Sequence, residues 1–219
     1  MHNFRTRHAV PTLLAVLTAI PAVLPAAEVE LGKSYSLSAP APLPAIREAG
    51  KFSCSLEPDF LVVEFAFVDS EVLALGQQDQ LEHHILGDLA EIFILPPDRK
   101  QYWEFFATPK GKQTCYHYER KADGTSYQLY ATGDVLIDVA IEITGNGWSG
   151  KVRIPLRKLE KNEPAFTVDG SWKMLVARQN YTGKVDKEHR ELSSYPQVSK
   201  VNFHLHSEYA AIKDGNAKK

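Results

Sequence analysis

The stretch "VLIDVAIEITGNGWSGKVRIPL" (Val135 to Leu156) decides the fold class. Its first half alternates apolar residues with Asp138 and Glu142, so an extended chain here has one apolar face and one polar face. The turn residues "TGNG" follow, and the alternation then resumes with Val152 and Ile154 on one face. A turn of this composition between two alternating runs predicts a β-hairpin.

The same alternation recurs along the rest of the chain. It is found in "FLVVEFAFV" (60–68), "AEIFIL" (90–95), "YWEFFAT" (102–108), "TCYHYER" (114–120), "SYQLYA" (126–131) and "SWKMLVARQNY" (171–181). Pro, Gly, Asp and Asn separate these runs, and helical patterns are limited to single turns at 79–84 and 155–160. Many short strands with turn signals between them predict an all-β protein, an antiparallel β-sandwich.

The amino-terminal segment predicts export. Arg5 and Arg7 precede an apolar run and two small residues, which is the pattern of a secretory signal peptide. Its three prolines argue against a membrane-spanning helix, and no later stretch is apolar for long enough to span a membrane. We expect a secreted or periplasmic protein. Its expected parts are a signal peptide (1–27), an irregular lead-in (28–50), a β-sandwich (51–212) and a disordered tail (213–219).

Charge and cysteine content restrict the partners and the cross-links. Removing the signal peptide leaves 23 basic residues against 27 acidic ones, so the chain has no basic footprint for nucleic acid. Cys54 and Cys115 are the two cysteines, and an oxidising compartment would permit a disulfide between them. Two buried free thiols are the alternative, and the sequence leaves both open.

The histidines and methionines suggest no metal or haem site. His204 and His206 would share one face of a strand, but no third ligand stands at a diagnostic spacing. We therefore expect no tight metal site, and expect His204 to pack near the sandwich edge with Tyr195. Met174, the methionine outside the signal peptide, follows the pattern of a core residue rather than a haem ligand. We expect no cofactor, and whether calcium supports a loop stays open.

Two glutamates interrupt apolar, aromatic-rich runs. Glu91 and Glu104 lie on either side of a Pro-Pro turn in the stretch 87–111. Burying an unpaired carboxylate costs several kcal/mol, so each needs solvent, a basic partner or a ligand. As a pair they would suit a glycosidase. A small single sandwich offers a surface rather than a deep cleft, so a sugar-binding surface of aromatic rings and polar groups is the better interpretation.

Four blocks, in order, resemble the family 9 carbohydrate-binding modules that accompany secreted enzymes such as xylanases. They are "FLVVEFAFVDSEV", "GDLAEIFILPP…QYWEFFATPKG", "GNGWSGKVRIPLRKL" and "GSWKMLVARQNY…ELSSYPQVSKVNFHLHSEYAAI", which together span about residues 50–212. The resemblance implies a β-sandwich that binds a poly- or oligosaccharide without catalysis. It also implies glycan-degrading enzymes as partners and a role in polysaccharide breakdown.

The resemblance also implies site residues. Its glutamate falls at Glu91, the preceding acid at Asp88, the strand arginine at Arg178, the stacking aromatic at Tyr195, and the Phe-His block contributes His204. We expect Glu91, Arg178 and Tyr195 to converge on one open groove at the edge of the sandwich, with no catalytic residue.

The chain departs from the family pattern at two places. His84 and Ile85 stand where the family has a stacking Trp, and Lys151 replaces a glutamate of the hairpin. A structural or interaction domain that has lost sugar binding is therefore the main alternative. A small glycoside hydrolase that uses Glu91 is the weaker one.

Overall fold

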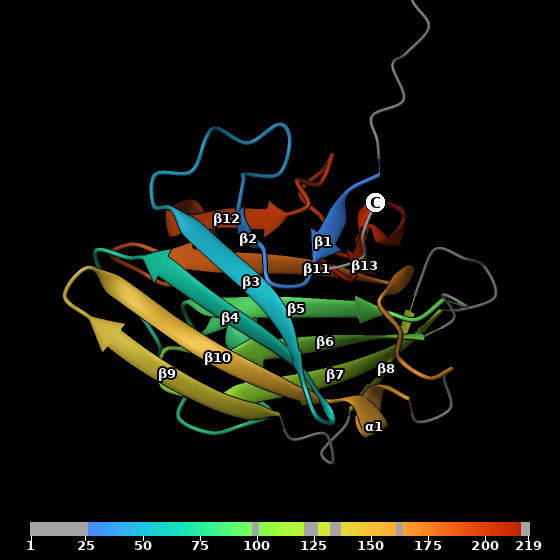
Figure 1. The fold of residues 1–219 in the computed structure, drawn as a ribbon. Helices are drawn as coiled ribbons and strands as arrows, with labels where there is room; N and C mark the ends of the chain where they lie inside the picture. Colours follow the sequence, from blue (N-terminus) through green and yellow to red (C-terminus); the bar gives the residue numbers. More distant parts are fainter. Residues whose placement is uncertain (1–25, 98–100, 121–126, 132–136, 161–163, 216–219) are drawn as a thin grey trace, which may run out of the picture.

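The computed structural model describes residues 26–97, 101–120, 127–131, 137–160 and 164–215. Within these ranges, thirteen strands form two sheets (Figure 1). The larger sheet has the order β1 (Glu28–Glu30), β13 (Ala210–Lys213), β11 (Asp169–Tyr181), β5 (Leu89–Leu95), β6 (Gln101–Ala107), β7 (Gln113–Arg120) and β8 (Tyr127–Ala131), and β12 (Arg190–Tyr195) also pairs with β11. The smaller sheet has the order β2 (Ser34–Ser36), β3 (Gly50–Glu57), β4 (Phe60–Val68), β10 (Gly147–Pro155) and β9 (Asp138–Thr144).

The predicted all-β antiparallel sandwich is confirmed. Among the described strands, β1 and β13 pair in parallel and the other pairs are antiparallel. The helical turns are short: η1 (His83–Ile85), α1 (Leu156–Leu159), η2 (Lys187–His189) and η3 (His206–Glu208). α1 falls within the predicted turn 155–160, and η1 overlaps the predicted turn 79–84 but extends to Ile85.

The hairpin that decided the fold class is present as β9 and β10. Thr144 pairs with Gly147 across the turn. Gly147 has a φ of +149°, and a Cβ atom there would lie 2.0 Å from the carbonyl oxygen of Phe67, so only glycine fits. The apolar face of β9 is only partly covered: Val139 and Ile141 are half-buried, and Ile143 is 58% exposed. The cause is position, because β9 forms the outer edge of the smaller sheet.

The predicted irregular lead-in, 28–50, needs correction. It contains β1 and β2, which pair with β13 and β3. Val29 at the centre of β1 is fully buried, so this short strand closes one edge of the core. Most of the predicted signal peptide (1–25) and the end of the predicted tail (216–219) lie outside the described residues, and both stay predictions. No helix in the described part of the chain is long and apolar enough to cross a membrane.

The main core lies between the two sheets. It draws alternate side chains from both sheets, among them Phe52 and Val63 from the smaller one and Ile92 and Phe105 from the larger one. Met174 belongs to this core, which confirms the role that the sequence predicted for it.

The cysteines occupy the same core as free thiols. Cys54 on β3 and Cys115 on β7 are both buried, at 1% and 0% exposure. The disulfide that the sequence left open is therefore not formed in the structure. The Cys54 Sγ instead lies 3.7 Å from the sulfur of Met174.

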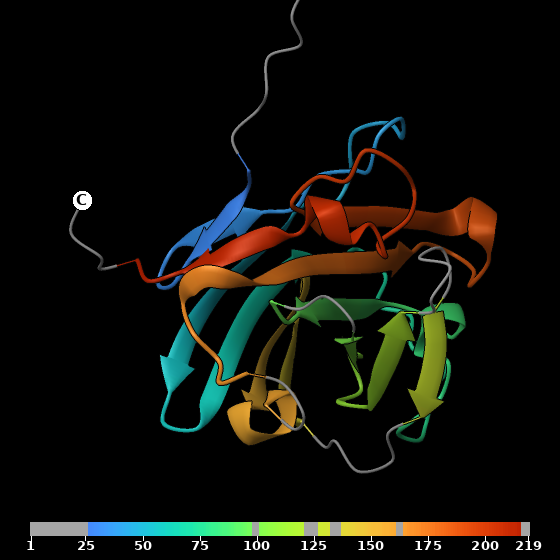
Figure 2. The ribbon, with the colours of Figure 1, turned by 90° about the vertical axis from the view of Figure 1, so that its right-hand side faces the viewer.

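A second, smaller core covers part of the opposite face of the larger sheet. The segment 196–209, which connects β12 to β13, packs Val198, Phe203 and Tyr209 on Phe93 and Leu175. In Figure 2 this segment is red and lies beside β11. The larger sheet is therefore partly buried on both faces, and the rest of its outer face is free to form a site.

Candidate functional site

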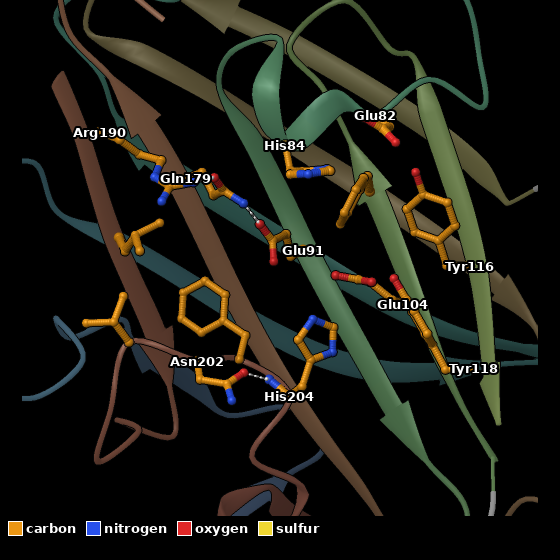
Figure 3. Close-up of a pocket in the computed structure, with 14 residues that line it drawn as sticks. Glu82, His84, Glu91, Glu104, Tyr116, Tyr118, Gln179, Arg190, Asn202 and His204 are labelled. Carbon is orange, nitrogen blue, oxygen red and sulfur yellow. Dashed lines mark hydrogen bonds between the residues drawn. The ribbon is translucent and has the colours of Figure 1, made fainter. Parts of the chain in front are cut away.

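A pocket of about 410 Å³ opens on the face of the larger sheet that points away from the smaller sheet (Figure 3). Strands β5, β6, β7 and β11 contribute its floor. Strand β12, the loop before β5 and the segment 196–209 contribute its walls. The site therefore lies beside the second core, with the sheet as a rigid base.

Strand periodicity explains which side chains reach the pocket. On β5, Ala90 and Ile92 point into the main core, so Glu91 between them points to the opposite face. On β6, Trp103 and Phe105 point into the main core, so Glu104 lies on the pocket side. The two glutamates are thus on one face of two neighbouring strands, as Figure 3 shows.

Glu91 is buried and is oriented by an amide. It is 2% exposed, and its Oε1 accepts a hydrogen bond from the Nε2 of Gln179 on β11. The Oε1 of Gln179 in turn accepts a hydrogen bond of 3.1 Å from the guanidinium of Arg190 on β12. Arg190 thus positions Gln179, and Gln179 positions Glu91. Burial raises the pKa of Glu91 to about 7, and the amide hydrogen bond opposes part of that rise.

Glu104 is the second buried acid of the pocket. It is 4% exposed and shares a hydrogen bond with the side chain of Tyr118 on β7. Burial, followed by the neighbouring charge of Glu91, raises the pKa of Glu104 well above its usual range. Two desolvated carboxyls that face one another do not both ionise readily, so the charge of Glu91 disfavours ionisation of Glu104.

Aromatic rings surround the two acids. Phe106 on β6 meets the ring of Tyr116 edge-on, at 5.5 Å between centroids, and lies 6.0 Å from the ring of His84. Phe203 from the segment 196–209 forms part of the opposite wall. Flat apolar faces next to buried polar groups match the two kinds of surface that a sugar ring presents.

His204 belongs to this pocket and not to the edge near Tyr195. Its Nδ1 shares a hydrogen bond of 2.7 Å with the hydroxyl of Tyr102, and its backbone N–H donates to Asn202. Burial lowers the pKa of His204, which favours the neutral ring. The predicted packing of His204 against Tyr195 is therefore wrong, because the segment 196–209 carries it over the outer face of the larger sheet.

The histidine pair is not arranged as the sequence suggested. His204 lies in a turn and His206 begins η3, so the two do not share one face of a strand. In the described residues, no group of three or more His, Cys, Asp or Glu side chains is placed to hold a metal ion.

Arg178 lies on the opposite face of the sheet from the pocket. It continues the row of core side chains on β11, and its guanidinium lies 3.1 Å from the carboxylate of Asp69. It also donates hydrogen bonds to the carbonyl of Val68 (2.7 Å) and to Asn180 (2.6 Å). These contacts join β11 to the end of β4, so Arg178 has a structural role.

Asp88 and Tyr195 also lie outside the pocket. Asp88 is buried and accepts a hydrogen bond from the backbone N–H of Tyr181, at 2.7 Å. Tyr195 packs against Tyr35 and Phe52 beside the main core, and its hydroxyl donates to the carbonyl of Glu28. The predicted convergence of Glu91, Arg178 and Tyr195 on one groove is therefore wrong. Of the five predicted sugar-binding residues, the pocket contains Glu91 and His204.

The fold defines a class of protein, the all-β sandwiches of two packed sheets. A crystal structure from Bacteroides uniformis ATCC 8492, described as a "putative carbohydrate-binding protein", is similar to this chain with a TM-score of 0.60 and 11% identity. The match covers 81% of this chain and 84% of that chain. It confirms the fold that the resemblance to family 9 modules implied.

Two further solved structures are of family 9 carbohydrate-binding modules themselves. Both come from Caldicellulosiruptor kristjanssonii, one in complex with glucose and one with cellotriose. Their TM-scores are 0.46 and 0.47, at 11% and 10% identity. The matches cover 76% and 78% of this chain and 82% of each module. No family model matches the sequence, and no curated protein matches it.

Proposed function

We propose that this protein binds a saccharide in the pocket on the outer face of the larger sheet and does not transform it. One observation carries the proposal. The pocket places two buried carboxyl groups and an amide next to aromatic faces, at a volume that suits a small ligand. The similar Bacteroides structure shares the fold at 11% identity, so the pocket and not the likeness is the main support.

The polar groups of the pocket are suited to sugar hydroxyls. A carboxylate accepts two hydrogen bonds from neighbouring hydroxyls, and an amide both donates and accepts. Glu91 is already oriented by Gln179, so little side-chain freedom is lost when a ligand binds. Tyr116 and Phe203 both line the pocket and offer aromatic rings to a ligand. The ligand completes the hydrogen bonding of acids whose burial would otherwise only cost stability.

We further propose that the protein is exported to the periplasm or secreted, and that it supports polysaccharide breakdown beside glycan-degrading enzymes. This part rests on the signal-peptide pattern of residues 1–27 and on the resemblance of the four sequence blocks. It is tested by locating the protein in cell fractions and in the medium.

Calorimetric titration with soluble cello-, xylo- and galacto-oligosaccharides tests the binding site. We expect measurable binding of at least one series by the wild type. Glu91→Gln should weaken it about tenfold or more, because a charge-assisted hydrogen bond is lost. Tyr195→Phe is the matched control, since it removes one hydroxyl outside the pocket and should leave affinity unchanged.

The other outcomes separate the alternatives. Equal losses in both variants would place the sugar elsewhere. If the wild type binds no saccharide, the protein is better explained as an interaction domain. Release of reducing ends would instead indicate a glycoside hydrolase that uses the facing acids.

A further inference from the structure

Among the described residues, no positively charged side chain is paired with the two acids inside the pocket. Glu91 and Glu104 are both more than nine-tenths buried, and their carboxyl groups face one another across the pocket floor (Figure 3). The polar partners that orient them, Gln179 and Tyr118, are neutral. Neither acid forms a salt bridge with a lysine or arginine among the described residues. A buried acidic pair of this kind is costly without a positive charge.

The cation nearest to the pair is engaged elsewhere. Arg190 lines the pocket, but its guanidinium donates to the Oε1 of Gln179 and also interacts with the hydroxyl of Tyr181. It therefore attracts Glu91 from a distance and leaves the carboxyl pair open to the pocket. The two histidines of the lining, His84 and His204, do not supply the charge either, because burial favours their neutral forms.

The walls are also suited to a cation. Tyr116, Tyr118 and Phe203 border the acids, and the electron-rich face of an aromatic ring attracts a positive charge within about 6 Å of its centroid. An ammonium group has three donors and no acceptor, so it would match two facing carboxyl groups that offer acceptors. A neutral hydroxyl supplies one donor and leaves the negative charge uncompensated.

We propose that the pocket selects an amine-bearing sugar, such as a glucosamine unit, whose ammonium group binds between Glu91 and Glu104. The proposal rests on the proposed function, since it names the class of saccharide for the same site. On binding, the ammonium favours the ionised form of both acids, so a proton held by either acid passes to solvent. The recognition is non-covalent, and no bond of the sugar is made or broken.

The test uses three ligands that differ mainly at one position. Cellobiose has a hydroxyl at the second carbon of each ring, the glucosamine disaccharide of chitosan has an amine there, and the disaccharide of chitin has an uncharged acetylated amine. Calorimetric titration at neutral pH should give an affinity for the glucosamine disaccharide about tenfold or more above that for cellobiose. The acetylated disaccharide should lose this advantage, because it carries no charge.

Variants assign the preference to the acidic pair. Glu104→Gln keeps the shape of the side chain and should reduce the preference for the amine about tenfold. Glu142→Gln on β9 is the matched control: it also removes one carboxylate, but from the exposed surface of the smaller sheet, and should leave the preference unchanged. Thermal unfolding of both variants verifies that they are folded.

The possible results distinguish this inference from the proposed function. If the neutral disaccharides bind as tightly as the amine, or if Glu104→Gln keeps the full preference, the inference is overturned and saccharide binding stands. If no disaccharide or longer oligosaccharide binds, both are overturned. If simple amines such as spermidine bind as tightly as the glucosamine disaccharide, the pocket recognises the charge and not the sugar, and the inference is also overturned.

Discussion

Glu91 and Glu104 meet because of the register between β5 and β6. Glu91 pairs with Phe106, and Phe93 pairs with Glu104, so the two glutamates are diagonal neighbours on one face. Diagonal neighbours in an antiparallel pair are about 7–8 Å apart at the backbone, which long side chains can bridge. A shift of one residue would turn either glutamate toward the main core. The apolar pattern that builds the sandwich therefore also fixes the geometry of the acidic pair.

We predict that Glu104→Gln stabilises the protein at alkaline pH. The pKa of Glu104 is raised in the folded state, so its contribution to stability is fully present below the ordinary glutamate pKa of about 4.3 and is lost as pH rises through the higher folded value. Above that value the wild type holds a buried negative charge that glutamine lacks. The variant should be similar in stability to the wild type at pH of about 5 and should become more stable, by roughly 1–3 kcal/mol, as pH rises through the folded pKa of Glu104.

Urea unfolding of both proteins across this pH range measures the difference. The comparison isolates the acidic pair, since the histidines and Asp88 titrate in both proteins and cancel. Glu142→Gln, which replaces an exposed acid, should show no such pH-dependent gain. A wild type that matches or exceeds Glu104→Gln in stability at alkaline pH would show that the buried carboxyl is not costly.

At the scale of elements, one buried ion pair ties the two sheets together at an end of the sandwich. The side chains of Arg178 on β11 and Asp69 after β4 are 1% and 0% exposed, with 3.1 Å between nitrogen and oxygen. Asp69 also accepts a hydrogen bond from the indole of Trp148 on β10. Burial raises the pKa of Asp69, and Arg178 opposes this rise. Arg178 is therefore needed to compensate the negative charge of Asp69 whenever Asp69 is ionised.

We predict that Arg178→Leu destabilises the protein by about 3–5 kcal/mol, because it leaves Asp69 as an uncompensated buried charge. Arg153→Leu on β10 is the control. Arg153 also pairs with an acid, Glu57 at 2.8 Å, but its side chain is 34% exposed, so the loss should be about 1 kcal/mol or less. Denaturant unfolding of the two variants gives the comparison. Equal losses would mean that burial does not distinguish the two ion pairs.

Local signals explain what the sequence predicted correctly among the elements. The hairpin of β9 and β10 has turn residues and alternation within one stretch, and the long strand β11 carries its own apolar period. Strands β1, β2 and β13 have three or four residues, too few for a period, and β12 is largely polar. Their pairing depends on distant segments, so the sequence did not reveal it.

Local signals likewise reveal only some residues of the candidate site. Glu91 and Glu104 stood out because each interrupts an apolar run. The family resemblance implies that Arg178 belongs to the site. Side chains alternate between the two faces along β11, however, and this alternation places Arg178 with Trp172 and Val176 on the core face. The same alternation places Gln179 on the pocket face, so the sequence contains a signal for this residue. The positions of Arg190 and His204 depend on how β12 and the segment 196–209 fold over the sheet, which no local pattern encodes.

At the scale of the whole molecule, the larger sheet serves two purposes. One face packs on the smaller sheet, and the other is shared between the second core and the pocket. The segment 196–209 contributes Phe203 to both, since this side chain packs on Phe93 and also lines the pocket. The stability of the second core and the shape of the binding site are therefore linked through one residue.

The two sheets are held together by packing and not by a disulfide, and the reactivity of the two cysteines tests this. Cys54 and Cys115 lie on different sheets as buried free thiols. Burial raises the pKa of Cys115 to about 12 and that of Cys54 further, so neither forms the reactive thiolate near neutral pH.

We predict that a thiol reagent labels neither cysteine in the native protein and labels both in guanidinium chloride without reductant. Reductant should leave the unfolding midpoint unchanged. The absence of reactive thiols in the unfolded, unreduced protein would reveal a bridge, which would stabilise the fold by roughly 3–4 kcal/mol.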